Sequence, residues 1–153
     1  MLRTRLSEQL AGALKARDKL TVSTLRLILA ALKDRDIAAR TKGTPDGISE
    51  DEILQMLQTM VRQREEAMVM FEKGRRDDLV RREAEEIAVI KRFLPTQLAD
   101  EAIAGCVTEA ITELGAKNFK DMGRVMALLR SRYAGRMDFA KASAVLKGQL
   151  GAP

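Results

Sequence analysis

Cationic side chains are crowded into the carboxyl-terminal quarter of the chain. The last 37 residues, 117–153, hold eight Lys/Arg and only two Asp/Glu, whereas the 22 residues before them, 95–116, hold four Asp/Glu and no base. The net charge of +5 for the whole chain hides this division. Clustered cations concentrate polyanions nearby and bind them with release of counterions. We therefore expect RNA or DNA as the first partner, ahead of an anionic membrane or an acidic protein.

Seven of these cations fall on the outer faces or at the ends of expected helices. At 100° per residue, Lys120 and Arg124 point away from the apolar stripe of their helix, and the others flank such a stripe, point outward or lie at a helix junction. A solvated face is the alternative, although such a face normally mixes charges of both signs. Few aromatic residues accompany the cations, which disfavours stacking on single strands and favours a folded nucleic acid read by shape and backbone. The candidate nucleic-acid-binding residues are Lys117, Lys120, Arg124, Arg130, Arg132, Arg136 and Lys141.

Two charged residues interrupt apolar stripes in the first part of the chain. Arg64 falls between Val61 and Met68, and Glu83 falls between Leu79 and Ile87. The turn between the two expected helices makes them neighbours, so the sequence predicts a partly buried ion pair of Arg64 and Glu83. Its alternative role is a polar site in which Glu83 acts as an acid or base, although structural ion pairs also perturb pKa values.

The chain lacks the side chains that most catalytic centres need. It has no histidine, which excludes Ser-His-Asp and Cys-His machinery and the commonest transition-metal ligand. Its one cysteine, Cys106, follows Ile103 on the apolar side of a helix and is expected to be a buried, unreactive thiol. We therefore name no catalytic residue, no metal ligand and no cofactor.

Composition also indicates where the chain works. A single cysteine fits a reducing compartment. The first ten residues, MLRTRLSEQL, carry charges where a signal peptide needs an apolar run, and no run of 18 apolar residues occurs. The expected location is the cytoplasm, without a membrane partner.

Apolar residues recur with helical spacing from end to end, which predicts an all-α fold. Residues 95–97, which include Pro95, divide four expected helices from three. Because the loops are short, successive helices should pack antiparallel. We expect a four-helix bundle over residues 1–94 and a three-helix bundle over 97–153. The seven expected helices cover about 3–17, 19–40, 50–73, 78–94, 100–114, 119–134 and 139–150.

Three blocks of sequence resemble the GatB/YqeY-like family and together cover almost the whole chain. The first is LRLILAALKDRDI, residues 25–37. The second runs from VRQREEAM at Val61 to FLPTQL, residues 93–98, and the third is KDMGRVMALL followed by GRMD, residues 120–138. The chain departs from the family where it has Ala127 and Phe139 in place of frequent glycines, and where it has Arg75 just after Gly74.

The resemblance implies two helical bundles, of four and then three helices, and a role in RNA binding. The same module forms the tail of the B subunit of the glutamine-dependent amidotransferase that converts Glu-tRNA(Gln) or Asp-tRNA(Asn), and that tail helps to hold the tRNA. Stand-alone members are grouped with carbon–nitrogen ligases that use glutamine as amido-N-donor. The implied partners are tRNA or another folded RNA and an amidotransferase complex.

Three functional hypotheses follow. The first is a tRNA-binding helical module that is accessory to glutamine-dependent tRNA amidation. The second is a protein–protein adaptor without nucleic-acid binding, for which the methionine-rich spacing of Met56, Met60, Met68 and Met70 would supply an adaptable interface. The third is an independent amidotransferase, which would need a glutaminase site that the sequence does not show.

Overall fold

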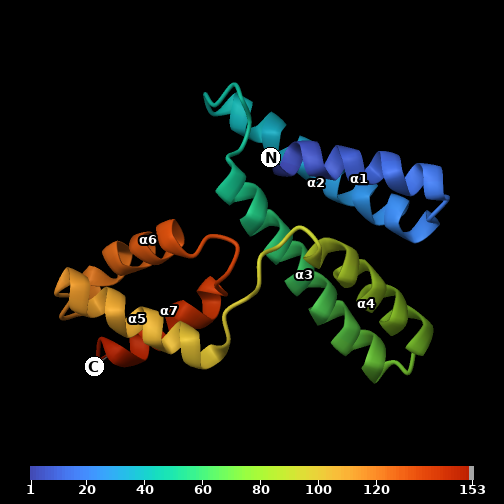
Figure 1. The fold of residues 1–153 in the computed structure, drawn as a ribbon. Helices are drawn as coiled ribbons and strands as arrows, with labels where there is room; N and C mark the ends of the chain where they lie inside the picture. The colour runs from blue at the N-terminus through green and yellow to red at the C-terminus, as the bar shows by residue number, and fades with distance from the viewer. Residues whose placement is uncertain (152–153) are drawn as a thin grey trace. The chain divides into compact units, whose positions relative to one another are not determined.

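The computed structural model describes residues 1–151, and within them it contains seven α-helices, one short 3₁₀ helix and no strand (Figure 1). The all-α prediction is confirmed. The chain divides into two compact units, of which the first is Met1–Leu94 and the second begins at Pro95. The helices are α1 (Leu2–Ala16), α2 (Lys19–Thr41), α3 (Glu50–Lys73), α4 (Asp77–Lys91), α5 (Asp100–Leu114), α6 (Met122–Arg132) and α7 (Phe139–Gln149), with the 3₁₀ helix at Phe119–Asp121.

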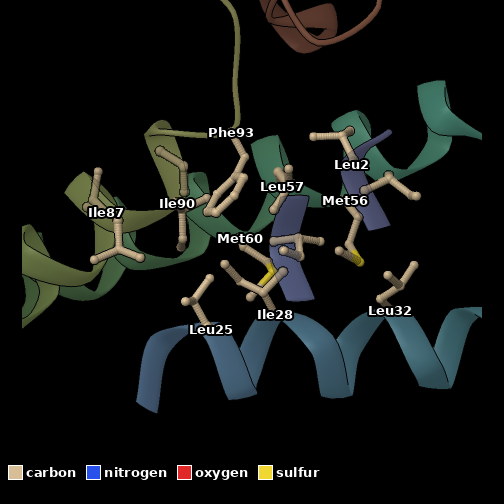
Figure 2. Close-up of a cluster of buried hydrophobic side chains, with 14 of the residues drawn as sticks. Leu2, Leu25, Ile28, Leu32, Met56, Leu57, Met60, Ile87, Ile90 and Phe93 are labelled. Carbon is tan, nitrogen blue, oxygen red and sulfur yellow. The ribbon is translucent and has the colours of Figure 1, made fainter. Parts of the chain in front are cut away.

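The first unit consists of two helical hairpins. α1 packs on α2, α3 packs on α4, and contacts between α2 and α4 join the two hairpins. Figure 2 shows Leu25, Ile28 and Leu32 of α2 pointing at Met56 and Met60 of α3. The apolar stripes expected from the sequence thus meet in one core, and burying them is the main source of stability for this unit.

Side-chain caps fix where several helices begin. Ser49 and Glu52 form the expected capping box at the start of α3, with each side chain accepting from the other residue's backbone N–H. Asp18 accepts a hydrogen bond from the backbone N–H of Thr21 at the start of α2, and Asp138 accepts from two backbone N–H groups at the start of α7. These acceptors satisfy donors that a helix start otherwise leaves unpaired.

Two helices end on an arginine in the left-handed conformation, where glycine is the usual residue. Arg17 has φ 57° after α1, and Arg75 has φ 53° after α3. After α3, the N–H of Arg76 donates to the carbonyl of Phe71, and that of Arg75 donates to Glu72, which is the Schellman pattern. Arg75 therefore occupies the left-handed position of this ending, one residue after Gly74. A residue with a Cβ is strained there.

A polar cluster that the sequence reasoning missed ties α1 and α2 to the loop before α3. Asp36 is buried, and its carboxylate accepts from Arg3 Nη2 at 2.8 Å and from the Ile48 N–H at 2.9 Å. Gly47 has φ 85°, and a Cβ there would overlap the Asp36 carboxylate. The Arg3 guanidinium is the main reason that the pKa of Asp36 is lowered to about 2. A detectable signal was present, because Asp36 continues the apolar stripe four residues after Leu32.

The second unit has its own core, in which α5, α6 and α7 contact one another. The helix expected over 119–134 is shorter than predicted, because a 3₁₀ turn capped by Asn118 precedes α6 and the helix ends at Arg132. The start of the unit is fastened to the α6–α7 turn. There the Gln97 amide donates to the Gly135 carbonyl, and the Leu98 N–H donates to the Arg136 carbonyl at 2.8 Å.

Candidate nucleic-acid interface

All seven candidate cations are exposed, and all lie in the second unit. Lys117 and Lys120 lie just before α6, and Arg136 lies in the turn after it. Arg124, Arg130 and Arg132 project from α6 itself, and Lys141 from α7. Six of the seven cations therefore lie on one short helix or in the segments that flank it, and the seventh lies on α7.

Three of these cations already have acidic partners. Arg124 lies 3.0 Å from Asp121, Arg132 lies 2.6 Å from Glu113, and Lys141 lies 3.1 Å from Asp100, nitrogen to oxygen. The hydrogen bond from Arg132 is the main cause of the lowered pKa of Glu113. All three cations are solvated, and ion pairs between exposed side chains contribute about 1 kcal/mol or less. A phosphate can exchange for such a carboxylate at little cost.

Arg130 has an aromatic partner. Its guanidinium carbon lies 5.9 Å from the centre of the Phe139 ring, so Arg130 is directed to α7, whereas Arg132 is directed to α5. These two arginines therefore leave α6 on opposite flanks. The cations of α6 therefore reach toward both neighbouring helices.

Lys117, Lys120 and Arg136 have no acidic side-chain partner among residues 1–151. The backbone on either side of α6 is nevertheless ordered by hydrogen bonds. Asp121 accepts from the N–H of Lys117 at 2.9 Å, and the N–H of Arg136 donates to the carbonyl of Tyr133. Unpaired cations on a fixed backbone are the groups best prepared to take phosphate oxygens.

The single thiol is less buried than expected. Cys106 is partly exposed, and Tyr133 at the end of α6 lies against it. A hydrogen bond with Cys106 is the main cause of the raised pKa of the Tyr133 hydroxyl. The contact between these two side chains joins α5 to the end of α6.

The predicted ion pair between Arg64 and Glu83 is wrong in its partner. Arg64 Nε donates instead to Glu86 Oε2 at 3.1 Å, one turn further along α4, and Arg82 Nε lies 3.4 Å from the other Glu86 oxygen. Glu83 Oε2 is buried without a hydrogen-bond partner among the described residues. Burial, and then the Glu86 charge, raises the pKa of Glu83. Glu86 could have been recognised, because it lies seven residues after Leu79 in the same stripe.

The methionines offered as an interface belong mostly to the core. Met56 and Met60 are buried, and Met68 packs against the first core from its edge. Only Met70 is open, with 66% of its surface exposed beside Val69 at 50%. The four methionines therefore do not share one exposed face.

Within residues 1–151, no three Cys, Asp or Glu side chains gather closely enough to hold a metal ion. No helix in the same range is both long and apolar enough to cross a bilayer.

Comparison with known proteins identifies a family and several named relatives. The model of the family described as Yqey-like protein matches residues 3–150. Proteins named "Altered inheritance of mitochondria protein 41, mitochondrial" are similar to this chain. The one from Lachancea thermotolerans is 33% identical over 115 residues, which are 74% of this chain and 59% of the relative. The one from Kluyveromyces lactis is 29% identical over 112 residues, 71% and 58% of the two chains. The chain spans less than two thirds of the length of these relatives, whose names place them in mitochondria.

Proposed function

Because the chain belongs to the YqeY-like family, we propose that it is a helical module that binds tRNA or a similarly folded RNA through the cations around α6. In this proposal the two units are the four-helix and three-helix bundles that the resemblance implies, and the second one contacts the RNA. The observation that supports it most is the set of three exposed cations with neither an acidic nor an aromatic partner among residues 1–151, at both ends of α6: Lys117, Lys120 and Arg136.

The arrangement suits a folded RNA better than a single strand. Cations that surround a helix can contact phosphates on both sides of a groove, and recognition of that kind depends on shape and backbone. Base stacking on a single strand would need several open aromatic rings. Phe139 is partly buried beneath Arg130, and Tyr133 is partly buried beside Cys106. Phe119, between Lys117 and Lys120, is the one exposed ring of this unit among residues 1–151, with 39% of its surface open, and one ring cannot stack a run of bases. We therefore expect the chain to distinguish RNA by its fold more than by its sequence.

The test is a filter-binding titration of the chain with bulk tRNA, and with duplex DNA of equal mass, over a salt series. Binding to tRNA should be tighter, and its logarithm should fall linearly with the logarithm of salt concentration. Arg136→Gln should weaken binding to every tRNA and make the salt slope shallower by about 1. Lys147→Gln is the matched control, because Lys147 is an exposed cation of the same unit outside the proposed surface.

Three results would contradict the proposal: no binding, binding that ignores salt, or equal losses from Arg136→Gln and Lys147→Gln. The family's link to glutamine-dependent amidation enters the proposal as an association with a larger enzyme, and we assign no reaction to this chain. Glutamine hydrolysis by the purified protein would contradict this proposal, because it would show a reaction that the chain catalyses alone.

The adaptor hypothesis keeps one specific observation, the exposed pair Val69 and Met70 at the end of α3. A pull-down from lysate with and without nuclease separates it from RNA binding. Partners that persist after nuclease treatment, and that Met70→Ser removes, would favour the adaptor.

A further inference from the structure

A groove of about 720 Å³ lies in the first unit, remote in sequence from the cations around α6. It is lined by residues from the end of α1, from α2 and from α4. These three helices belong to one compact unit. Leu14 and Leu27 contribute to its apolar lining, and they remain 47% and 48% exposed. These half-open leucines mark an apolar surface that the described part of the chain leaves uncovered.

The charged side chains that line the groove, here called its cationic rim, are all Lys or Arg. Arg17, Lys19, Arg26 and Arg82 line it, and no acidic side chain does. Arg82 shares the Glu86 carboxylate with Arg64, while the other three have no acidic partner among residues 1–151. An occupant must therefore bring negative charge as well as apolar side chains.

The residues of α2 in the groove follow the spacing of a helix-packing face. Lys19, Val22, Ser23, Arg26 and Leu27 stand at positions i, i+3, i+4, i+7 and i+8. That spacing forms a continuous stripe into which the ridge of a second helix fits. The core-facing stripe of α2 runs through Leu25, Ile28 and Leu32. Val22 is shared, because it lines the groove and is also buried in this core, so the open apolar surface of the groove is mainly that of Leu14 and Leu27.

From this geometry we propose that the groove between α1, α2 and α4 is a docking site for an acidic amphipathic helix of a partner protein. The apolar side chains of that helix pack on Leu14, Val22 and Leu27, and its carboxylates meet the cationic rim, in the manner of helix-in-groove recognition. An RNA strand fits less well, because the lining has no aromatic ring and its floor is apolar.

A second copy of this chain is also a poorer occupant. Its acidic helix, α5, buries Ile103, Val107 and Ala110 in the second core. The residues that α5 exposes are acidic or small, and none is a large apolar side chain. α5 could supply charge to the groove but could not fill its floor.

The test uses a labelled synthetic peptide of about 18 residues, with leucines three and four apart on one face and glutamates on both flanks. Fluorescence anisotropy with the full chain should show saturable binding that weakens as salt is raised. A twin peptide with lysines in place of the glutamates should bind at least about tenfold more weakly. In a heteronuclear NMR titration the shifts should cluster at Leu14, Val22 and Leu27.

Paired variants keep the test independent of folding. Arg26→Glu should weaken the acidic peptide by about tenfold, whereas Lys33→Glu, at another exposed cation of α2, should not. Leu27→Ala should weaken it, whereas Ile37→Ala, at an equally exposed apolar residue of α2, should not.

Four outcomes would overturn the proposal. The first is that the acidic peptide does not bind, and the second is that its lysine twin binds equally well. The third is that the two variants of either pair lose affinity equally. The fourth is that the chain is a dimer which Arg26→Glu converts to a monomer, because a second copy would then occupy the groove. Loss of tRNA affinity in Arg26→Glu with peptide binding intact would assign the groove to RNA instead. Since RNA binding around α6 is tested by Arg136→Gln, the two proposals can fail separately.

Discussion

Glu83 and Glu86 lie three residues apart on α4 and have opposite consequences for stability. Glu86 is 8% exposed and holds two arginines, whereas Glu83 has a buried oxygen without a hydrogen-bond partner among the described residues. A buried charge is stabilising only when it is paired, and removing one partner of a buried pair costs several kcal/mol. The two carboxylates are therefore not interchangeable, although both interrupt the same apolar stripe.

Glu86→Gln should lower the free energy of unfolding by about 3 kcal/mol, because it leaves Arg64 without a charge partner. Glu83→Gln should leave stability at pH 7 equal or higher. Since burial raises the pKa of Glu83 above 4.5 in the folded state, its neutral form favours folding at low pH, and that advantage is lost as pH rises through the folded pKa. Denaturant unfolding at pH 4 and pH 7 measures both effects. A Glu83→Gln protein less stable than Glu86→Gln would contradict this assignment.

Asp36 shows the opposite dependence on pH. Its pKa is lowered to about 2 from 3.8, so its stabilising effect is present above pH 3.8 and is lost as pH falls through about 2. Asp36→Asn should lower the free energy of unfolding at pH 7 by about 2 kcal/mol and flatten this acid dependence. Asp34→Asn, at an exposed carboxylate of the same helix, is the control and should change little. Parallel acid unfolding curves for wild type and Asp36→Asn would refute the role given to this carboxylate.

At the scale of elements, the ends of the helices carry strain that one substitution can relieve. Arg75 holds a left-handed conformation, which costs a side chain with a Cβ about 1 kcal/mol more than it costs glycine. Arg75→Gly should therefore raise the free energy of unfolding by about 0.5–1 kcal/mol. Glu66→Gly, at an exposed position inside α3, should lower it by about 1 kcal/mol. Chemical denaturation of both variants decides the matter; destabilisation by Arg75→Gly would show that its side chain has a role elsewhere.

Helical spacing in the sequence predicted the stripes and most helix starts, because both depend on local geometry. It could not predict how far one helix is displaced along another. For Arg64 that displacement decides between Glu83 and Glu86, and it is set by the turn through Gly74 and Arg75. The groove on α2 could not be predicted for another reason. In the sequence Lys19, Ser23 and Arg26 look like a solvated face, and only the fold brings Leu14 of α1 and Arg82 of α4 beside them.

For the whole molecule, the two separate cores predict two separable unfolding events. Leu57 is buried in the first core and Leu129 in the second. Leu57→Ala should destabilise the first unit by about 2–5 kcal/mol and leave the transition of the second in place, and Leu129→Ala should do the reverse. Hydrogen exchange followed by residue can assign each transition. Equal loss of protection in both units from either variant would show that they unfold together.

The cations considered above form two separate groups, one in each unit of the chain. We propose that the cations around α6 bind RNA and that the cations around the α2 groove bind an acidic helix. The sequence located the first set because it is contiguous. The second set is dispersed from Arg17 to Arg82 and becomes a group only in the fold.

The enclosure of Gly47 against Asp36 also bears on the chemical ageing of the chain. Gly47 follows Asp46. In an Asp-Gly pair the glycine amide nitrogen can attack the aspartate side-chain carboxyl and form a succinimide with loss of one water. Addition of water to the other carbonyl of the ring then gives isoaspartate, which has an extra methylene in the backbone. In the fold the Gly47 N–H donates to the Thr44 carbonyl at 3.2 Å, and Gly47 is packed against Asp36. The attack requires the loop to open. The polar cluster around Asp36 thus slows succinimide formation between Asp46 and Gly47. A variant without this cluster should accumulate isoaspartate at position 46 on storage.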